Sequence, residues 1–177
     1  MSEYAVLIPR VTTENGAALL LEVRSDKVRQ PGEICFPGGR IEAGETPADA
    51  AVRETCEELG ITAELITEIE EPVIEVMGDG RVVYSVEAKL LLDDISELDL
   101  SLDEVAEVFL LPKKWLIDNP PAFYDLSVTA DSDLPAELKR YLAGYGDYRR
   151  TGSTDYWEYE GHGIWGLTAR LIRSKLK

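Results

Sequence analysis

The sequence predicts an α/β or α+β domain built on a mixed β-sheet, and two observations support this fold class. Extended apolar segments alternate along the chain with segments of helical spacing, a pattern typical of sheets that carry helices. The chain has 177 residues, of which 45% are apolar, and this is enough for one well-packed core. No internal repeat or linker divides the sequence, so we expect a single domain over residues 1–177.

The strands are predicted from runs of aliphatic and β-branched residues that are bounded by turn residues. A Glu-Asn-Gly turn at residues 14–16 separates the first two strands, and a Gly-Asp-Gly turn at residues 78–80 precedes a long later strand. The segments expected to be extended are residues 4–11, 16–24, 81–92, 104–111 and 156–161, with further apolar segments at 62–69 and 72–77.

The best-defined helix is predicted over residues 47–59. Thr46 is expected to cap its amino terminus, and Pro47 suits the first helical position. Gly60 is expected to end the helix in a left-handed conformation. The other predicted helices are residues 112–119 with Pro112 at the first position, residues 134–145, and residues 164–177 with Ile164, Thr168, Leu171 and Ile172 on the inward face.

Composition and charge restrict the class of protein. The net charge of −16 argues against a nucleic-acid scaffold, because affinity for phosphate backbones requires basic surface. No apolar run approaches the roughly 20 residues of a membrane span, and the first residues lack the pattern of a secretory signal. Cys35 and Cys56 are too few for a disulfide framework. We therefore expect a reducing, cytoplasmic setting in which both are small buried residues.

The helix predicted over residues 47–59 carries an acidic face. At about 100° per residue, Glu54, Glu57 and Glu58 lie on adjoining turns of one side. Such acids are often simply solvated, and composition alone leaves that interpretation open. Arg53 is the only cation among them, however, and the Pro-Gly-Gly turn before the helix lets backbone carbonyls approach. Converging oxygen ligands suit Mg²⁺ or Mn²⁺, which would relieve the repulsion between the carboxylates.

The same stretch matches the Nudix box, G-x5-E-x7-R-E-U-x-E-E-x-G-U, in which U is a bulky apolar residue. The matching residues are Gly39, Glu45, Arg53, Glu54, Glu57, Glu58, Gly60 and Ile61. Thr55 stands at the first U position and is a departure from the pattern. The chain thus resembles the Nudix hydrolase family. This resemblance implies a Nudix fold, a mixed sheet between helices, in which the box forms a loop, a helix and a second loop.

The resemblance also implies a chemistry. Members of the family hydrolyse a nucleoside diphosphate linked to another moiety, with Mg²⁺ or Mn²⁺ as the cofactor. By the same resemblance, Arg53 would pair with Glu45 and hold the box in register. The general base would be Glu54 or a later glutamate; Glu104 and Glu107 are candidates, although each is also interpretable as a surface acid. The implied metal ligands are the backbone carbonyl of Gly38 and the carboxylates of Glu54, Glu57 and Glu58, with Glu104 as a further candidate.

The residues before the box resemble the signature of coenzyme A diphosphatases, LLTxRS-x3-R-x3-G-x3-FPGG. There are two departures: Glu22 replaces the threonine, and two residues rather than three separate Arg29 from Gly32. Arg24 and Arg29 would contact phosphates of coenzyme A, because guanidinium suits phosphate geometry, or would instead pair with surface carboxylates. Residues 163–172 also resemble the last helix of that subfamily. The matching residues are Leu20, Leu21, Arg24, Ser25, Arg29, Gly32 and Phe36–Gly39.

Three functions from different classes follow. The first is a metal-dependent diphosphatase that cleaves coenzyme A or its derivatives into 3′,5′-ADP and 4′-phosphopantetheine. The second is the same chemistry on ADP-ribose, a nucleotide sugar or a dinucleotide. The third is a non-catalytic Nudix-fold binding module, which the intact set of acids argues against. In each case the expected partner is a small nucleotide rather than a nucleic acid or a membrane, and homodimers are common in the family.

Overall fold

The computed structural model of the protein describes residues 3–77, 81–129 and 149–176. Within these ranges eight strands form one sheet, in the order β3-β2-β1-β7-β5, with β4 on β1, β6 on β7 and β8 on β2. The predicted turn at residues 78–80 and the predicted helix at residues 134–145 lie outside the described residues. The strands are β1 (Glu3–Thr13), β2 (Gly16–Arg24), β3 (Ile34–Cys35), β4 (Gly38–Arg40), β5 (Ile66–Thr67), β6 (Val73–Val76), β7 (Val82–Leu90) and β8 (Val105–Pro112).

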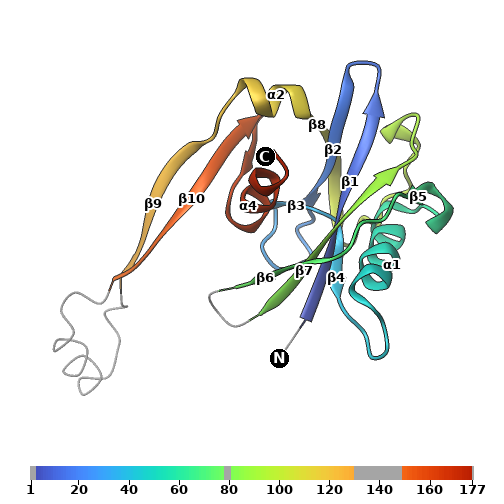
Figure 1. The fold of residues 1–177 in the computed structure, drawn as a ribbon, viewed down its shortest axis with the longest axis horizontal. Coiled ribbons are helices and arrows are strands. Elements are labelled where there is room, and N and C mark those ends of the chain that lie inside the picture. The colour runs from blue at the N-terminus through green and yellow to red at the C-terminus, as the bar shows by residue number, and fades with distance from the viewer. Residues whose placement is uncertain (1–2, 78–80, 130–148, 177) are drawn as a thin grey trace.

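Helices and a second sheet complete the described structure. Helices α1 and α4 lie on opposite sides of the main sheet, and the ribbon of β9 and β10 reaches away from it (Figure 1). The second sheet has the order β11-β10-β9. The remaining elements are α1 (Pro47–Leu59), α2 (Lys113–Asp118), α4 (Gly166–Ser174), 3-10 turns at Ala63–Leu65 and Ile95–Glu97, β9 (Ala122–Thr129), β10 (Arg149–Tyr159) and β11 (His162–Ile164).

Strand β1 organises the sheet because it pairs with three other strands. Its end pairs antiparallel with β2, where Arg10 lies opposite Leu19. Its first half pairs antiparallel with β4, where Val6 lies opposite Gly38, and parallel with β7. A parallel pair beside antiparallel pairs makes the sheet mixed, so the predicted fold class is confirmed. Because β4 leads into the loop before α1, its pairing with β1 also helps to position that helix.

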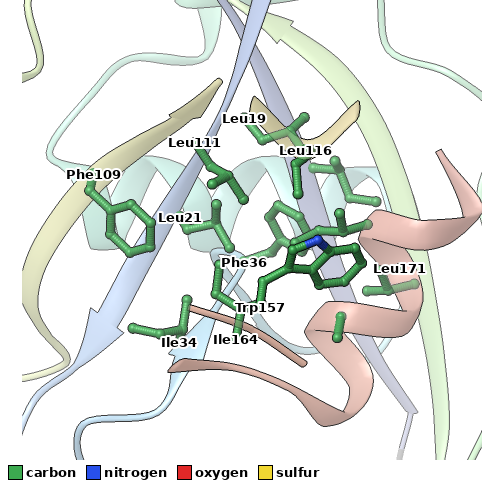
Figure 2. Close-up of a cluster of buried hydrophobic side chains, with 13 residues drawn as sticks. Leu19, Leu21, Ile34, Phe36, Phe109, Leu111, Leu116, Trp157, Ile164 and Leu171 are labelled. Atoms are coloured by element: carbon green, nitrogen blue, oxygen red, sulfur yellow. The ribbon is translucent and has the colours of Figure 1, made fainter. Parts of the chain in front are cut away.

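Each face of the sheet is covered by its own apolar core. On the α4 side, Leu21 and Phe109 of the sheet pack with Trp157 of β10 and Leu171 of α4 (Figure 2). The indole N–H of Trp157 donates to the backbone carbonyl of Asn119 at 2.9 Å, which satisfies the polar atom of this buried ring. Burial of apolar surface is the main stabilising contribution, at roughly 25 cal/mol per Å². The core on the α1 side contains Ala5, Leu7, Val11, Leu20, Ala50, Ala51, Leu59, Ile66, Val86, Ala88 and Leu90.

Helix α1 has the bounds that its local signals predict. Thr46 caps it by accepting a hydrogen bond from the N–H of Asp49 at 3.2 Å, and the Asp49 carboxylate accepts in return from the N–H of Thr46. Pro47 is the first helical residue, where a missing N–H is harmless. Gly60 ends the helix with φ 63°, a left-handed conformation that suits glycine. The prediction for residues 47–59 is confirmed.

Other elements differ from the prediction near their ends. Pro112 is the last residue of β8 rather than the first residue of α2. The final helix begins at Gly166, because Ile164 pairs with Trp157 in the β10–β11 ladder. Residues 62–69 form a 3-10 turn followed by the short strand β5. Strand β9 was not predicted, because its sequence lacks a clear alternation and its pairing with β10 is set by residues far along the chain.

Candidate active site

The candidate site lies where the backbone of β4 contacts the acidic side chains of α1. The N–H of Gly38 donates to Oε2 of Glu58 at 2.8 Å. Gly38 has φ 150°, and a side chain there would overlap the backbone of β1. A Cβ atom on Gly39 would overlap the carboxylate of Glu54. Glycine is therefore required at position 38 for β4 to lie this close to β1, whereas a side chain at position 39 would require the Glu54 carboxylate to move.

Arg53 links the loop before α1 to the acids of the helix. Its Nε lies 2.7 Å from Oε1 of Glu45, and its Nη2 donates to Oε2 of the same carboxylate at 3.1 Å. Its Nη1 lies 3.0 Å from Glu54 and 3.3 Å from Glu57. Nη2 also donates to the carbonyl of Arg40 at 3.2 Å. The hydrogen bonds from Arg53 lower the pKa of Glu45 to about 2, so this carboxylate is ionised over the physiological range.

The three glutamates of the α1 acidic face have different environments. Glu57 is exposed, with 58% of its side chain accessible, whereas Glu54 is largely covered. Glu58 is only 5% exposed, although it lies on the same predicted face of the helix as Glu57. Burial, together with the nearby charge of Glu22, raises the pKa of Glu58 to about 9. Burial also raises the pKa of Glu54, while the hydrogen bond from Arg53 opposes that rise.

Glu22 is a site residue that sequence reasoning did not select. It lies on β2 and is 1% exposed. Among the charged neighbours of Glu58, Glu22 raises the pKa of Glu58 the most. Its Oε1 accepts a hydrogen bond from the thiol of Cys35 at 3.2 Å. Burial raises the pKa of Glu22 to about 7. The available signal was the departure from threonine in the coenzyme A pattern, but its burial depends on strand pairing that the sequence does not display.

The two candidate acids of the later loop lie in different places. Glu104 is exposed. Its N–H donates to the carbonyl of Ser101 at 2.8 Å, and its carbonyl accepts from the N–H of Ser25 at 2.9 Å. Its charge contributes to the raised pKa of Glu22, Glu54 and Glu58, so it belongs to the same acidic group. Glu107, by contrast, is two residues from Phe109 on β8 and therefore shares the α4 face.

The environment of Glu107 also separates it from the acidic group. Its Oε1 lies 3.8 Å from Nε2 of His162. The ring of His162 stacks on Phe109, with the ring centroids 4.2 Å apart. The structure therefore brings Glu104 to the acids of α1 and leaves Glu107 on the other face of the sheet.

Arg24 and Arg29, the candidate substrate contacts, also differ in position. Arg24 lines a cavity of about 310 Å³ between β3, β7 and the start of α4. Its Nε donates to the carbonyl of Arg29 at 2.9 Å, and its Nη1 approaches the sulfur of Cys35 at 3.9 Å. Arg29 is exposed, and this hydrogen bond uses its backbone rather than its guanidinium. The cavity is also lined by Gln30, Glu33, Ile34, Cys35, Met77, Arg81, Val83, Trp165, Gly166, Leu167 and Thr168.

The donors at this site are carboxylate oxygens, which are the ligands that a hard divalent cation prefers. Among the residues that the structure describes, no three Asp, Glu, His or Cys side chains are gathered closely enough to hold one. Arg53 instead contacts Glu54 and Glu57 directly. Oε2 of Glu22 is buried and has no hydrogen-bond partner within the same residues. A hard cation fits this donor set, because it would compensate the buried Glu22 and Glu58, which form no salt bridge with a basic side chain of the described residues.

The described part of the chain contains no helix with the length and apolar character that crossing a membrane requires.

The cysteines offer no nucleophile. Both are free thiols, and burial raises the pKa of each, so both are protonated at neutral pH. The chemistry available at the site is therefore that of carboxylates, backbone groups and guanidinium.

Comparisons with known proteins agree with this description. The family model for the NUDIX domain matches residues 1–124. The chain is 40% identical over 127 residues to Nudix hydrolase 3 of Caenorhabditis elegans, covering 66% of this chain and 50% of that protein. It is 32% identical over 130 residues to the peroxisomal coenzyme A diphosphatase NUDT7 of Mus musculus, covering 72% and 54%. The chain spans about half the length of these two relatives.

A solved structure has a similar fold. The crystal structure of an Ap4A hydrolase binary complex from Caenorhabditis elegans superposes with a TM-score of 0.54 and 26% identity. The match covers 81% of this chain and 99% of that chain. The fold is therefore similar to that of this solved structure.

Proposed function

Because the chain belongs to the Nudix family, we propose that it is a metal-dependent hydrolase that cleaves the diphosphate linkage of a nucleoside diphosphate derivative. One observation carries this proposal: the acids of α1 lie against the backbone of Gly38 and Gly39, beside the buried Glu22. A diphosphate brings further negative charge to these carboxylates, so a cation has to lie between them. The acids of the box are thus suited to catalysis through a bound divalent ion.

We assign the divalent ion, Mg²⁺ or Mn²⁺, to the donors that surround Glu58. The residues that would hold it are Glu54, Glu57 and Glu58, with the carbonyl of Gly38 and the carboxylate of Glu104. When bound, such an ion polarises the phosphorus and lowers the pKa of the attacking water. The burial of Glu58 and the nearby charges of Glu22, Glu54 and Glu104, all of which raise its pKa, support this assignment, because a divalent ion would compensate these carboxylates.

The remaining box residues have positioning and proton-transfer roles in this proposal. Arg53 and Glu45 hold the loop before α1 against the helix through two hydrogen bonds. The base that accepts a proton from water is Glu54 or Glu104, since both lie in the acidic group. Burial raises the pKa of Glu54, which makes it a stronger base than an ordinary glutamate. Glu107 is less suitable because it lies on the α4 face beside His162.

We propose coenzyme A or one of its derivatives as the substrate, with 3′,5′-ADP and 4′-phosphopantetheine as the products. The signature before the box and the 32% identity to the mouse coenzyme A diphosphatase support this choice. The cavity lined by Arg24 supports it further, because Cys35 lines the same cavity and donates to Glu22 of the acidic group. A phosphate held by Arg24 would therefore lie near the carboxylates of the site.

A second substrate class is favoured by a separate observation. The structure of an Ap4A hydrolase has a similar fold at 26% identity, which supports a dinucleotide as the alternative substrate. Ap4A and coenzyme A both present a phosphate chain attached to adenosine, so the same acids would act on either. The two substrates differ in the 3′-phosphate and in the group beyond the phosphate chain, and these features provide the basis for a test.

The proposal is tested by incubating the purified protein with coenzyme A, ADP-ribose or Ap4A, each with Mg²⁺, with Mn²⁺ or without metal. We expect 3′,5′-ADP and 4′-phosphopantetheine to be released from coenzyme A only when a divalent ion is present, as measured by chromatography. Cleavage of Ap4A or ADP-ribose without cleavage of coenzyme A would reject the coenzyme while keeping the hydrolase. Absence of hydrolysis for all three substrates in both metals would contradict the proposed function.

A further inference from the structure

Glu22 lies on the face of the sheet that α1 covers. Side chains alternate along β2, so Leu19 and Leu21 enter the core on the α4 side and Leu20 enters the core on the α1 side. Glu22 is two residues after Leu20 and therefore points to the same side. Val108, which lies opposite Glu22 on β8, packs in the α1-side core as well. The carboxylate of Glu22 is thus directed toward the helix that carries the box acids.

The hydrogen bonds around Glu22 leave one oxygen uncompensated. Its Oε1 accepts from the thiol of Cys35, whereas its buried Oε2 has no partner among residues 3–77, 81–129 and 149–176. The neighbouring Arg24 directs its guanidinium to the carbonyl of Arg29 and to Cys35 instead. A buried carboxylate without such a partner lowers stability, since its oxygen has lost hydrogen bonds to water without replacement.

The neighbours of Glu22 do not offset the effect of its burial. The hydrogen bond from Cys35 and the charge of Arg24 favour the anion, but burial is the largest effect and Glu104 adds to it, so the pKa of Glu22 is raised to about 7. Its charge and that of Glu58 lie close enough for Glu22 to raise the pKa of Glu58, and Glu104 raises the pKa of both. A buried glutamate elsewhere in the chain shows the contrast: Glu87 is 7% exposed and lies within 4 Å of Arg10, Lys113 and Lys175. The sheet can therefore provide basic partners for a buried acid, yet it provides none within ion-pair distance of Glu22 among the described residues.

We propose that Glu22 is an additional ligand of the divalent cation, which it binds through Oε2 together with Glu58. This inference rests on the proposed function, because it assigns a further residue to the same cation. The ion would supply the positive charge that the described residues do not place beside this oxygen. The threonine of the coenzyme A pattern cannot supply a negative charge at this position. Glu22 therefore gives this chain one more anionic ligand than that pattern contains.

The test is a titration of the purified protein with Mn²⁺, followed by electron paramagnetic resonance of the free ion. Wild type is compared with Glu22→Gln, which keeps the shape and the acceptor for Cys35 but removes the charge. Glu14→Gln is the matched control, because Glu14 is exposed in the turn before β2, and the first residue of β2, Gly16, is already roughly 20 Å from Glu22 at about 3.3 Å per residue. We expect Glu22→Gln to bind Mn²⁺ at least about tenfold more weakly, since loss of an outer-shell partner alone has an effect of this size. Glu14→Gln should bind like wild type.

Thermal melting with and without Mn²⁺ separates cation binding from a general effect on folding. Without metal, Glu22→Gln should be at least as stable as wild type, because a buried charge has been removed; the rise in melting temperature on adding Mn²⁺ should be smaller. If wild type and Glu22→Gln bind Mn²⁺ with equal affinity, Glu22 is a neutral buried acid and the inference fails while the proposed function stands. If wild type itself does not bind Mn²⁺, both are wrong.

Discussion

The backbone N–H of Gly38 donates to the carboxylate of Glu58 at 2.8 Å across 20 positions of sequence. This bond joins β4 to the last turn of α1 and holds a buried acid beside the glycines of the box. Glutamine at position 58 could keep the bond, because its amide oxygen is also an acceptor. The charge of Glu58 can therefore be removed without removing this contact.

We expect Glu58→Gln to lower turnover by orders of magnitude and to weaken binding of Mg²⁺. The folded protein without metal should gain stability, because burial raises the pKa of Glu58 and so disfavours its charged form. Glu57→Gln should also lower turnover, but it should change stability less because Glu57 is exposed. Turnover in limiting Mg²⁺ and melting without metal measure the two effects. A variant with the wild-type rate in limiting Mg²⁺ would remove that residue from the set of metal ligands.

Arg53→Ala should reduce activity and also lower the melting temperature by a few degrees. The substitution removes the two hydrogen bonds to Glu45 and leaves Glu54 and Glu57 without their shared cation. Differential scanning calorimetry and steady-state kinetics on the same preparation check the prediction. Arg53→Lys is the control for charge, and it should recover only part of the loss because lysine cannot make the paired contact with Glu45. Lost activity with an unchanged melting temperature would indicate direct contact with the substrate instead.

The contribution of the Glu45 carboxylate to stability should depend on pH in the acidic range. Its pKa in the folded protein is about 2, below the ordinary value of 4.5, because Arg53 donates to it. The stabilisation is therefore fully present above pH 4.5 and is lost as the pH falls through about 2. We expect Glu45→Gln to be less stable than wild type at pH 7, and the difference to shrink as the pH falls below 4.5. Urea unfolding at a series of pH values measures this difference, and a gap that widens on acidification would contradict the assignment.

Arg24→Gln should raise KM more for coenzyme A than for dephospho-coenzyme A, because only the 3′-phosphate distinguishes the two substrates. Loss of one charge-assisted hydrogen bond, worth about 1.5–3 kcal/mol, corresponds to a roughly tenfold to hundredfold fall in kcat/KM. Arg29→Gln tests the other candidate contact separately, because its side chain is exposed and Arg24 contacts only its backbone. Equal effects of Arg24→Gln on the two substrates would show that Arg24 does not contact the 3′-phosphate.

Local signals in the sequence predict α1 well, whereas its surroundings depend on distant residues. Thr46 and Gly60 bound the helix through contacts made within it, so its ends can be predicted from a short stretch. The burial of Glu58 depends instead on β4, which reaches it only because β1 positions that strand. The start of α4 could not be predicted from helical spacing, because Ile164 is held in a ladder with Trp157.

The candidate site shows the same division. The identity of the box acids could be read from their spacing, but their accessibility could not. Glu104 and Glu107 are three residues apart and equally plausible in the sequence, yet strand alternation directs Glu107 to the α4 face. Glu22 was visible only as a departure from threonine, because its burial results from pairing of β2 with both β3 and β8.

The parallel pairing of β1 with β7 has a consequence for synthesis on the ribosome. The apolar face of α1 packs in a core that includes Val86 and Ala88 of β7, which are translated well after the helix. Contacts between distant segments form late, and an incomplete core exposes apolar surface. The box helix therefore leaves the ribosome before its packing surface is complete, because β1 and β2 precede it but β7 follows it. Nascent chains arrested before Val82 should remain sensitive to protease in the α1 region, whereas chains extended past β8 should resist cleavage there.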